Sequence, residues 1–275
     1  MLKDYLNQAC RIFTENNIDD ASLESEVLVR HVLSYERVQL YQNMGQEFPT
    51  DKLNALESVI NRRLKGEPSA YITNHKEFYG LDFYVNSAVL IPRPETEHLI
   101  EKTLSVARRY EHPVIADIGT GSGAIAISLA TSLPSAKLFA VDISFDTLKV
   151  ADINCYRHKV HQRISLLCGN LLEPLQEKAD IIAANLPYVR KGDMPANSFE
   201  PKLALDGGED GLDVIRLLFQ QVEDKMNAGG HLLLEIGLGQ KDSVVALLKE
   251  IESVKDVEVI PDLGGIDRIV CASFR

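Results

Sequence analysis

The sequence predicts an α/β protein, in which a doubly wound, Rossmann-like sheet of seven strands with an antiparallel last strand follows a small N-terminal helical bundle and a β-hairpin linker. Apolar runs alternate with segments of helical periodicity from Pro113 onward, as in a parallel sheet covered by helices on both faces. A glycine-rich turn directly follows the first of these runs. No helix separates the last two runs, so we expect them to pair antiparallel.

The composition is that of a globular protein. The 275 residues are 45% hydrophobic and 25% charged, and no apolar stretch approaches the ~18 residues of a membrane span. The four cysteines are scattered and form no C-x-x-C pair, so we expect reduced thiols in a cytoplasmic protein and no metal site. The net charge of −11 argues against a broad nucleic-acid surface. The best candidate for a local basic patch is 62–65, which is otherwise the solvated end of a helix.

Residues 1–70 are expected to form an N-terminal helical domain. Apolar side chains recur at helical spacing in four segments, near residues 2–13, 23–33, 38–41 and 53–64. No catalytic constellation is visible in these segments. We therefore interpret the domain as a module for substrate recognition or for packing.

Residues 71–95 are expected to form a hairpin linker. The stretch 77–85 is aromatic and has β propensity around a central glycine. Two prolines then force an extended backbone before the next helix, which is predicted to start near Thr96. This stretch is either a rigid linker or one wall of an active site, with Arg93 and Glu95 as its polar groups.

Residues 96–275 are expected to hold the sheet and its helices. The strands are predicted at Val114–Ile118, Lys137–Asp142, Ile164–Cys168, Asp180–Ala184, His231–Ile236, Val257–Ile260 and Arg268–Ser273. The helices are predicted near 97–109, 122–132, 145–157, 210–226 and 240–251.

A nucleoside-containing cofactor is predicted at the glycine-rich turn 117–123. Glycines permit a tight turn and let a ligand press against the backbone, while the start of the following helix presents free N–H groups. Asp142 ends the second strand, where a carboxylate can accept hydrogen bonds from ribose hydroxyls. Asn170, after the third strand, offers a side-chain carbonyl to the amino group of an adenine.

Two cofactor classes fit this turn, because its glycine spacing also satisfies the loose dinucleotide fingerprint. Three features favour S-adenosylmethionine. Asp117 precedes the glycines, where its carboxylate can serve the amino group of that cofactor; the last strand is antiparallel; and the stretch 185–188 follows the fourth strand. The predicted cofactor-binding residues are Asp117, Gly119, Thr120, Gly121, Ser122, Gly123, Asp142, Asn170, Leu171 and Asn185.

The predicted catalytic segment is Asn185-Leu186-Pro187-Tyr188. It follows a buried parallel strand, so we expect it at the carboxyl edge of the sheet, where ligands bind. The asparagine amide offers both an acceptor and a donor, the proline stiffens the backbone, and the tyrosine adds a flat face with a polar tip. Together they suit a planar group that bears an NH2, either a carboxamide or the amino edge of a base. The alternative is an ordinary X-Pro turn at a strand end.

With these residues placed, the chain resembles the PrmC/HemK family, the methyltransferases that modify the glutamine of peptide-chain release factors. The matching motifs extend over nearly the whole chain. The most specific of them are Leu90-Ile91-Pro92-Arg93-Pro94-Glu95-Thr96-Glu97 and the segment from Glu200-Pro201 to Gly207-Gly208 and Asp210-Gly211-Leu212. Others are Glu77-Phe78-Tyr79-Gly80 and Leu234-Glu235-Ile236-Gly237 with Gln240.

Two positions depart from the family pattern. The family usually has Asn-Pro-Pro-Tyr, and Leu186 replaces the first proline in this chain. The resulting Asn-Leu-Pro-Tyr is also the form found in adenine dimethyltransferases that act on ribosomal RNA. The family usually has an aspartate where this chain has Asn170, whose carbonyl still accepts a hydrogen bond.

The resemblance implies methyl transfer from S-adenosylmethionine to the side-chain amide nitrogen of the glutamine in the Gly-Gly-Gln motif of release factors. Asn185 Oδ1 and the main-chain carbonyl of Leu186 would accept the two amide N–H groups, and Tyr188 would pack on the planar group. A second hypothesis is methylation of an adenine amino group in RNA or DNA, which the acidic net charge disfavours. A third is a non-catalytic binding partner that retains the fold. We expect a monomer without membrane attachment; the preferred release factor stays open.

Overall fold

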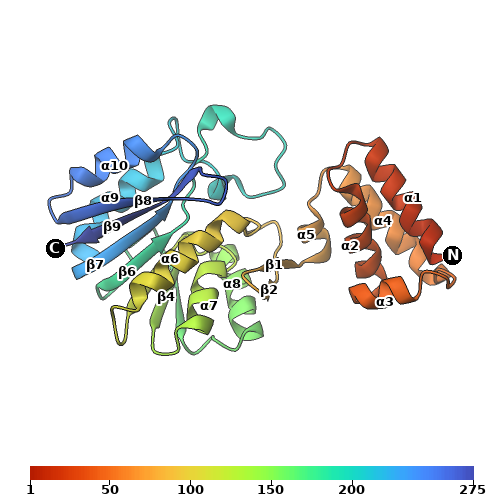
Figure 1. Cartoon of the computed structure of the whole chain (residues 1–275), viewed down its shortest axis with the longest axis horizontal. Helices are drawn as coiled ribbons and strands as arrows, with labels where there is room; N and C mark the ends of the chain where they lie inside the picture. Colours follow the sequence, from red (N-terminus) through yellow and green to blue (C-terminus); the bar gives the residue numbers. More distant parts are fainter. The chain divides into compact units, whose positions relative to one another are not determined.

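The computed structural model describes all 275 residues, and the chain divides into two compact units, Met1–His75 and Lys76–Arg275 (Figure 1). The first unit contains helices only, and the second contains both β-sheets. Each unit has its own group of buried apolar side chains. No helix in either unit is long and apolar enough to cross a membrane.

The N-terminal unit is a bundle of short helices around Phe13, Leu28 and Leu40, which are fully buried. Its elements are α1 (Leu2–Glu15), α2 (Ala21–Leu33), α3 (Arg37–Gln42), the 3-10 turn η1 (Thr50–Lys52), α4 (Leu53–Leu64) and α5 (Ser69–Thr73). Helix α5 was not predicted from the sequence. Tyr71 and Ile72 are buried on this short helix, so the chain around them is helical and does not yet belong to the hairpin.

The basic stretch 62–65 does not form a free cationic patch. Arg62 pairs with Glu67 at 2.6 Å, and Arg63 pairs with Glu24 of α2 at 2.6 Å. Both partners lie in the bundle itself, so these two guanidinium groups are already neutralised.

The predicted hairpin is present but short. Strands β1 (Lys76–Phe78) and β2 (Leu81–Phe83) pair antiparallel around Gly80, whose φ is +70°. The 3-10 turn η2 (Pro94–Thr96) and helix α6 (Glu97–Ala107) follow, and Thr96 is the N-cap residue of α6, as the proline-rich stretch predicts.

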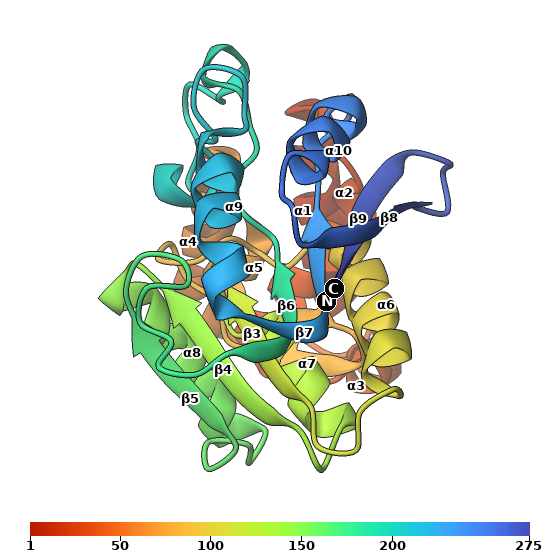
Figure 2. The ribbon, with the colours of Figure 1, turned by 90° about the vertical axis from the view of Figure 1, so that its left-hand side faces the viewer.

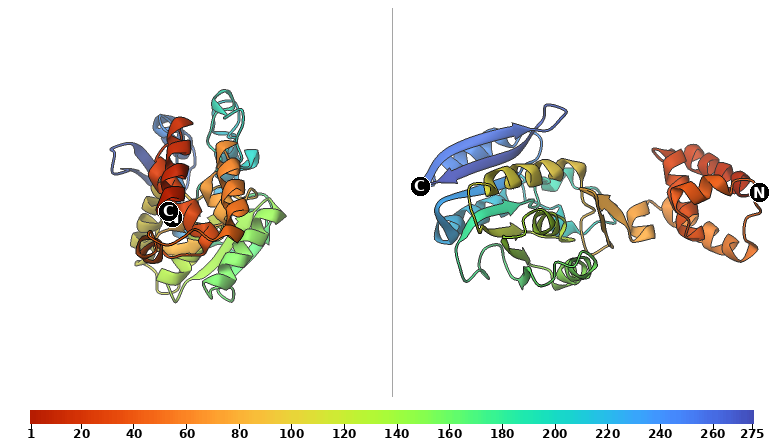
Figure 3. Two further views of the ribbon diagram at one scale, coloured as in Figure 1. Left: turned by 90° about the vertical axis from the view of Figure 1, so that its right-hand side faces the viewer. Right: turned by 60° about the horizontal axis from the view of Figure 1, so that its bottom comes forward.

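The main sheet has seven strands in the order β5-β4-β3-β6-β7-β9-β8. They are β3 (Val114–Ile118), β4 (Lys137–Asp142), β5 (Ile164–Cys168), β6 (Ala179–Ala184), β7 (Met226–Glu235), β8 (Val254–Pro261) and β9 (Asp267–Phe274). The first five are parallel, and the last strand, β9, lies antiparallel between β7 and β8. The predicted fold class is therefore confirmed, and Figure 3 shows β8 and β9 as a long ribbon at the edge of the sheet.

Helices cover both faces of this sheet. They are α6, α7 (Ala124–Ser132), α8 (Phe145–Arg157), α9 (Asp213–Lys225) and α10 (Lys241–Lys249). Figures 1 and 2 show α6, α7 and α8 on one face and α9 and α10 on the other. The sheet is thus doubly wound, and its parallel strands are enclosed by apolar side chains.

Two helices begin later than predicted, because glycines with positive φ interrupt them. Helix α7 begins at Ala124, after Gly121 and Gly123, whose φ values are +58° and +83°. Helix α9 begins at Asp213, after Gly211 with a φ of +80°. These irregular segments lie beside the strand ends, where the candidate site is found.

Candidate active site

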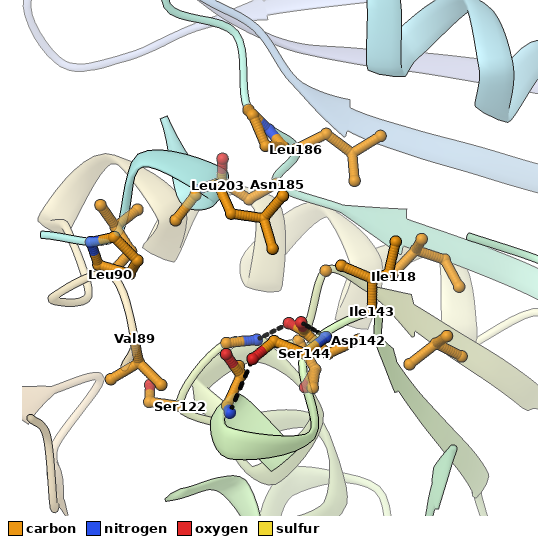
Figure 4. A pocket seen from close by; sticks show the side chains of 18 of the residues that line it. Val89, Leu90, Ile118, Ser122, Asp142, Ile143, Ser144, Asn185, Leu186 and Leu203 are labelled. Carbon is orange, nitrogen blue, oxygen red and sulfur yellow. Dashed lines mark hydrogen bonds between the residues drawn. The ribbon is translucent and has the colours of Figure 1, made fainter. Parts of the chain in front are cut away.

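A cavity of about 260 Å³ lies at the carboxyl edge of the parallel strands. Val89 and Leu90 form one side of it, as Figure 4 shows. The other sides come from the glycine turn, from the ends of β4 and β6, and from the loops that follow β5 and β6. The predicted site residues that line it are Gly119, Thr120, Gly121, Ser122, Asp142, Asn170, Leu171, Asn185, Leu186 and Pro187.

The glycine turn lies directly against the predicted catalytic segment. The N–H groups of Gly119 and Thr120 both donate to the carbonyl of Val141 at 2.9 Å, which ties the turn to the end of β4. Gly119 has a φ of +73°, and a Cβ there would lie 3.2 Å from Leu186 Cδ2 and 3.4 Å from the carbonyl oxygen of Asn185. Glycine at this position therefore permits both the backbone turn and the close approach of the two segments.

Asp117 organises the turn from behind and is not on the cavity surface. It is fully buried, and its Oδ2 accepts hydrogen bonds from Thr120 Oγ1 at 2.6 Å and from the N–H of Ala126 at 3.1 Å. Its Oδ1 has no hydrogen-bond partner. Burial raises the pKa of Asp117 to about 7. Because Asp117 does not line the cavity, the interaction predicted between its carboxylate and the amino group of the cofactor is not a direct contact.

Asp142 presents its carboxylate to the cavity at the end of β4. Its Oδ2 accepts from the N–H of Gly121 at 3.1 Å, and its Oδ1 accepts from the N–H of Ser144 at 3.0 Å; Figure 4 shows Asp142 beside Ser144. Burial raises its pKa. Each oxygen keeps a further lone pair, so the carboxylate can accept hydrogen bonds from two neighbouring hydroxyl groups.

Asn170 and Leu171 lie on the cavity wall after β5. Asn170 Nδ2 donates to Glu173 Oε1 at 2.9 Å, so the opposite oxygen, Oδ1, is left as an acceptor. Ile143, which the sequence analysis did not single out, also lines the cavity and is 54% exposed. An exposed isoleucine beside a free amide oxygen suits a flat, partly apolar ring with an amino group.

Asn185 and Leu186 present two acceptors that the protein does not use. Asn185 Nδ2 donates to Thr96 Oγ1 at 3.0 Å, whereas Asn185 Oδ1 accepts no hydrogen bond. The main-chain carbonyl of Leu186 accepts none either. The Leu186 side chain is 3% exposed and packs in the core, so only its backbone is available for polar contacts.

Tyr188 lies behind the cavity and does not line it. Its hydroxyl donates to Glu235 Oε1 at 3.3 Å, and burial followed by the charge of Glu235 raises the pKa of Tyr188 to about 12. The phenol therefore stays protonated. Because its ring is not in the cavity wall, Tyr188 does not take the predicted position for packing on a planar substrate group.

Gln240 holds the backbone of the catalytic segment, a role that the sequence analysis missed. Its Nε2 donates to the carbonyls of Tyr188 at 3.0 Å and Gly211 at 3.2 Å, and its Oε1 accepts from the N–H of Gly237 at 2.8 Å. A Cβ at Gly211 would lie 2.4 Å from the Tyr188 carbonyl oxygen. Gln240 and the close approach at Gly211 therefore hold together the loops that contain Tyr188, Gly211 and Gly237.

Of the two polar residues expected in the wall of the site, Arg93 lines the cavity and Glu95 does not. Arg93 lines the cavity, and its Nη2 lies 2.6 Å from Glu200 Oε2, while Glu200 Oε1 accepts from the N–H of Ile91 at 3.1 Å. Glu95 is exposed and lies outside the lining. Arg93 therefore contributes to the expected wall, and Glu200, which is outside the lining, holds it in place. No group of three or more His, Cys, Asp or Glu side chains that could hold a metal ion is present.

Comparison with known proteins gives matches along both units. Residues 4–73 match the family described as PrmC N-terminal domain, and residues 96–200 match the family described as Methyltransferase small domain. The release factor glutamine methyltransferase of Moorella thermoacetica is 39% identical over 279 residues, covering 100% of this chain and 99% of the relative. That of Neisseria gonorrhoeae is 40% identical over 259 residues, covering 92% and 93%. A methyltransferase from Pyrococcus furiosus shares the fold, with a TM-score of 0.53 at 18% identity over 78% of this chain and 98% of that chain.

Proposed function

We propose that this chain, which belongs to the release factor glutamine methyltransferase family, transfers a methyl group to the side-chain amide nitrogen of the glutamine in the Gly-Gly-Gln motif of peptide-chain release factors. The observation that carries the proposal is the pair of unused acceptors, Asn185 Oδ1 and the Leu186 carbonyl, at the cavity. A primary carboxamide has two N–H groups and needs two such acceptors.

The cofactor is S-adenosylmethionine, which supplies an electrophilic methyl group when it is bound. We assign Asp142 to the ribose hydroxyls and Asn170 to the adenine amino group, because both have free acceptor oxygens on the cavity wall. Leu171 and Ile143 border the same region and suit the ring. The remaining predicted cofactor-binding residues form the glycine turn, whose shape Asp117 maintains from behind.

Asn185 and Leu186 act on the substrate nitrogen in this proposal. A carboxamide nitrogen is a poor nucleophile, because its lone pair is shared with the carbonyl. Two acceptors that take its two N–H groups raise its electron density and fix its orientation toward the methyl group. Leucine retains the main-chain carbonyl that the more usual proline would offer, so the substitution does not remove an acceptor. Pro187 stiffens the segment and Tyr188 positions it from behind.

The N-terminal unit has no catalytic cluster, and we assign it to recognition of the protein substrate. We further propose that the protein acts in the cytoplasm, since all four cysteines are free, and that it acts as a monomer. Nucleic acid is not part of the proposal, because the net charge is −11 and the basic stretch 62–65 is largely paired.

The test is methyl transfer from labelled S-adenosylmethionine to three acceptors: a release factor, the same factor with its Gly-Gly-Gln glutamine replaced by alanine, and ribosomal RNA. We expect label only in the intact factor, and mass spectrometry of its peptides should place the methyl group on that glutamine. Label in the RNA instead would favour the adenine alternative. Label in none of the three would argue for a binding protein without activity.

A further inference from the structure

A buried carboxyl group lies directly behind the segment that carries Asn185. Glu235 ends β7, beside the end of β6, and is 1% exposed. Its Oε2 accepts from Thr96 Oγ1 at 2.7 Å, and its Oε1 accepts from the Tyr188 hydroxyl at 3.3 Å. Glu235 does not line the cavity, so any effect of its carboxylate on the reaction passes through these neighbours.

The hydrogen bonds in this group have a defined direction. A carboxylate has no proton to donate, so the Thr96 hydroxyl gives its single proton to Glu235. Thr96 Oγ1 can then only accept from Asn185, which lies 3.0 Å away, and Asn185 must turn Nδ2 toward it. A planar amide that turns its NH2 to one side turns its carbonyl oxygen to the other. The orientation with Oδ1 left for the substrate therefore follows from the charge on Glu235.

The groups around Glu235 shift the pKa of its carboxyl group. Burial raises the pKa of Glu235 above its ordinary value, and the hydrogen bonds from Thr96 and Tyr188 and the charge of Arg268 offset only part of this rise, to which the carboxylate of Glu95 adds. Tyr188 keeps its proton, so it remains a donor to this carboxylate. If Glu235 carried a proton, it would donate to Thr96, and the Thr96 proton could then turn to Asn185 Oδ1 and reverse the amide.

We propose that Glu235 and Thr96 are positioning residues that hold the Asn185 side chain with its carbonyl oxygen toward the substrate amide. The inference rests on the proposed function, because it concerns the orientation of the acceptor assigned there. Thr96 is the N-cap residue of α6, and Glu235 lies 139 residues later, so the relay exists only in the folded protein. This role accounts for the buried carboxylate of Glu235, because burial of a charged group is unfavourable unless it is hydrogen-bonded.

The test uses Thr96→Val, which keeps the shape of the side chain but removes the hydroxyl. Thr103→Val is a matched control, because Thr103 is fully buried on the same helix and donates only to the carbonyl of Leu99, at 2.7 Å. We expect Thr96→Val to lower kcat for methyl transfer by about tenfold or more, the value of one lost hydrogen bond of about 1.4 kcal/mol, with KM and cofactor Kd within about twofold. Thr103→Val should leave kcat unchanged, and Thr96→Ser should restore most of it.

Glu235→Gln tests the charge at mildly alkaline pH, since its amide can donate to Thr96 and release the Thr96 proton toward Asn185. We expect a loss of kcat similar to that of Thr96→Val. A second readout needs no activity: the side-chain NH2 signal of Asn185 in ¹⁵N NMR, identified by its absence in Asn185→Ala, should shift and exchange faster in Thr96→Val than in Thr103→Val.

Normal kcat in Thr96→Val, or an unchanged Asn185 NH2 signal, would overturn the relay. Equal losses in Thr96→Val and Thr103→Val would also overturn it, because they would indicate a general packing effect. A wild-type protein that fails to methylate the release factor would refute the proposed function separately, while the NMR comparison would still decide whether Thr96 holds Asn185.

Discussion

Replacement of Asn185 by alanine is the most direct test of the catalytic assignment. The change removes Oδ1, which has no partner in the protein, and Nδ2, which donates to Thr96 at 3.0 Å. The fold should lose only one neutral hydrogen bond, about 1 kcal/mol, because Asn185 is half-buried after the end of β6 and is not part of the apolar core. The rate should fall much further, since an acceptor aimed at the reacting group contributes about 3 kcal/mol, or about a hundredfold in kcat.

Asn185→Asp separates the two atoms of the amide. The carboxylate keeps an acceptor but has no N–H for Thr96, whose own proton already goes to Glu235. Two carboxylates would then compete for one hydroxyl proton, and the new charge would lie close to Glu235. We expect the aspartate variant to be impaired as well.

The assay is single-turnover methyl transfer to a release factor with saturating cofactor, together with calorimetry of cofactor binding for each variant. Asn227→Ala is a suitable control, because Asn227 also makes one side-chain hydrogen bond, to Asp180 Oδ1 at 2.8 Å, near the opposite end of β6 and β7. Methyl transfer by Asn185→Ala within a few-fold of wild type, together with normal cofactor binding, would show that Asn185 is not a catalytic residue.

Asp142→Ala should weaken cofactor binding at least tenfold in calorimetry, because it loses two hydrogen bonds of about 1.5–3 kcal/mol each to ribose hydroxyls; unchanged affinity would contradict the assignment. Asp117 has its pKa raised to about 7 by burial, so the stability it contributes is complete below its ordinary pKa of 3.8 and is lost as pH rises toward 7, by about 4 kcal/mol at most. Asp117→Asn should flatten that part of the stability profile in urea unfolding of the cofactor-free protein, and an unaltered slope would show that the buried Asp117 carboxyl is not its source. A chain that begins at Lys76 should still bind cofactor but lose most activity on an intact release factor; full activity would contradict the recognition role of the first unit.

The strands were predictable because their apolar runs are short and sharply bounded. Strands β3, β4 and β5 have the predicted bounds and β6 differs by one residue, whereas β7 begins at Met226 and not at the predicted His231. Helix starts were harder, because glycines with positive φ lie inside stretches of helical periodicity, as Gly211 does before α9. The helix α5 was missed because it has only five residues, too few to show a helical period.

The site residues were predictable where a polar side chain lies at or directly after the end of a strand in the sequence. Asp142 and Asn185 are of this kind, because the topology of a parallel sheet alone brings strand ends together. Thr96 and Gln240 are of another kind. Thr96 looks like a helix start and Gln240 like the first residue of a predicted helix, and only the tertiary structure brings the first to Glu235 and the second to Tyr188.

Leu186 allows the side chain and the main chain of the catalytic segment to be tested separately. Its side chain is 3% exposed in the core, whereas its proposed function belongs to the main-chain carbonyl alone. Leu186→Ala should therefore lower the free energy of unfolding by about 2–5 kcal/mol, as for other buried leucines. It should leave kcat within about threefold, less than 1 kcal/mol of barrier, at a temperature where the variant is folded.

The pattern expected for Asn185→Ala is the reverse, with a stable protein and a lost rate. The backbone of the segment should hold its position without the leucine side chain, because Gln240 fixes the Tyr188 carbonyl and Gly119 lies against the carbonyl of Asn185. Urea unfolding and single-turnover transfer on the same preparations would measure both quantities. If Leu186→Ala loses as much rate as Asn185→Ala while it remains folded, the leucine side chain itself positions the substrate, and the explanation of its tolerance in place of proline is wrong.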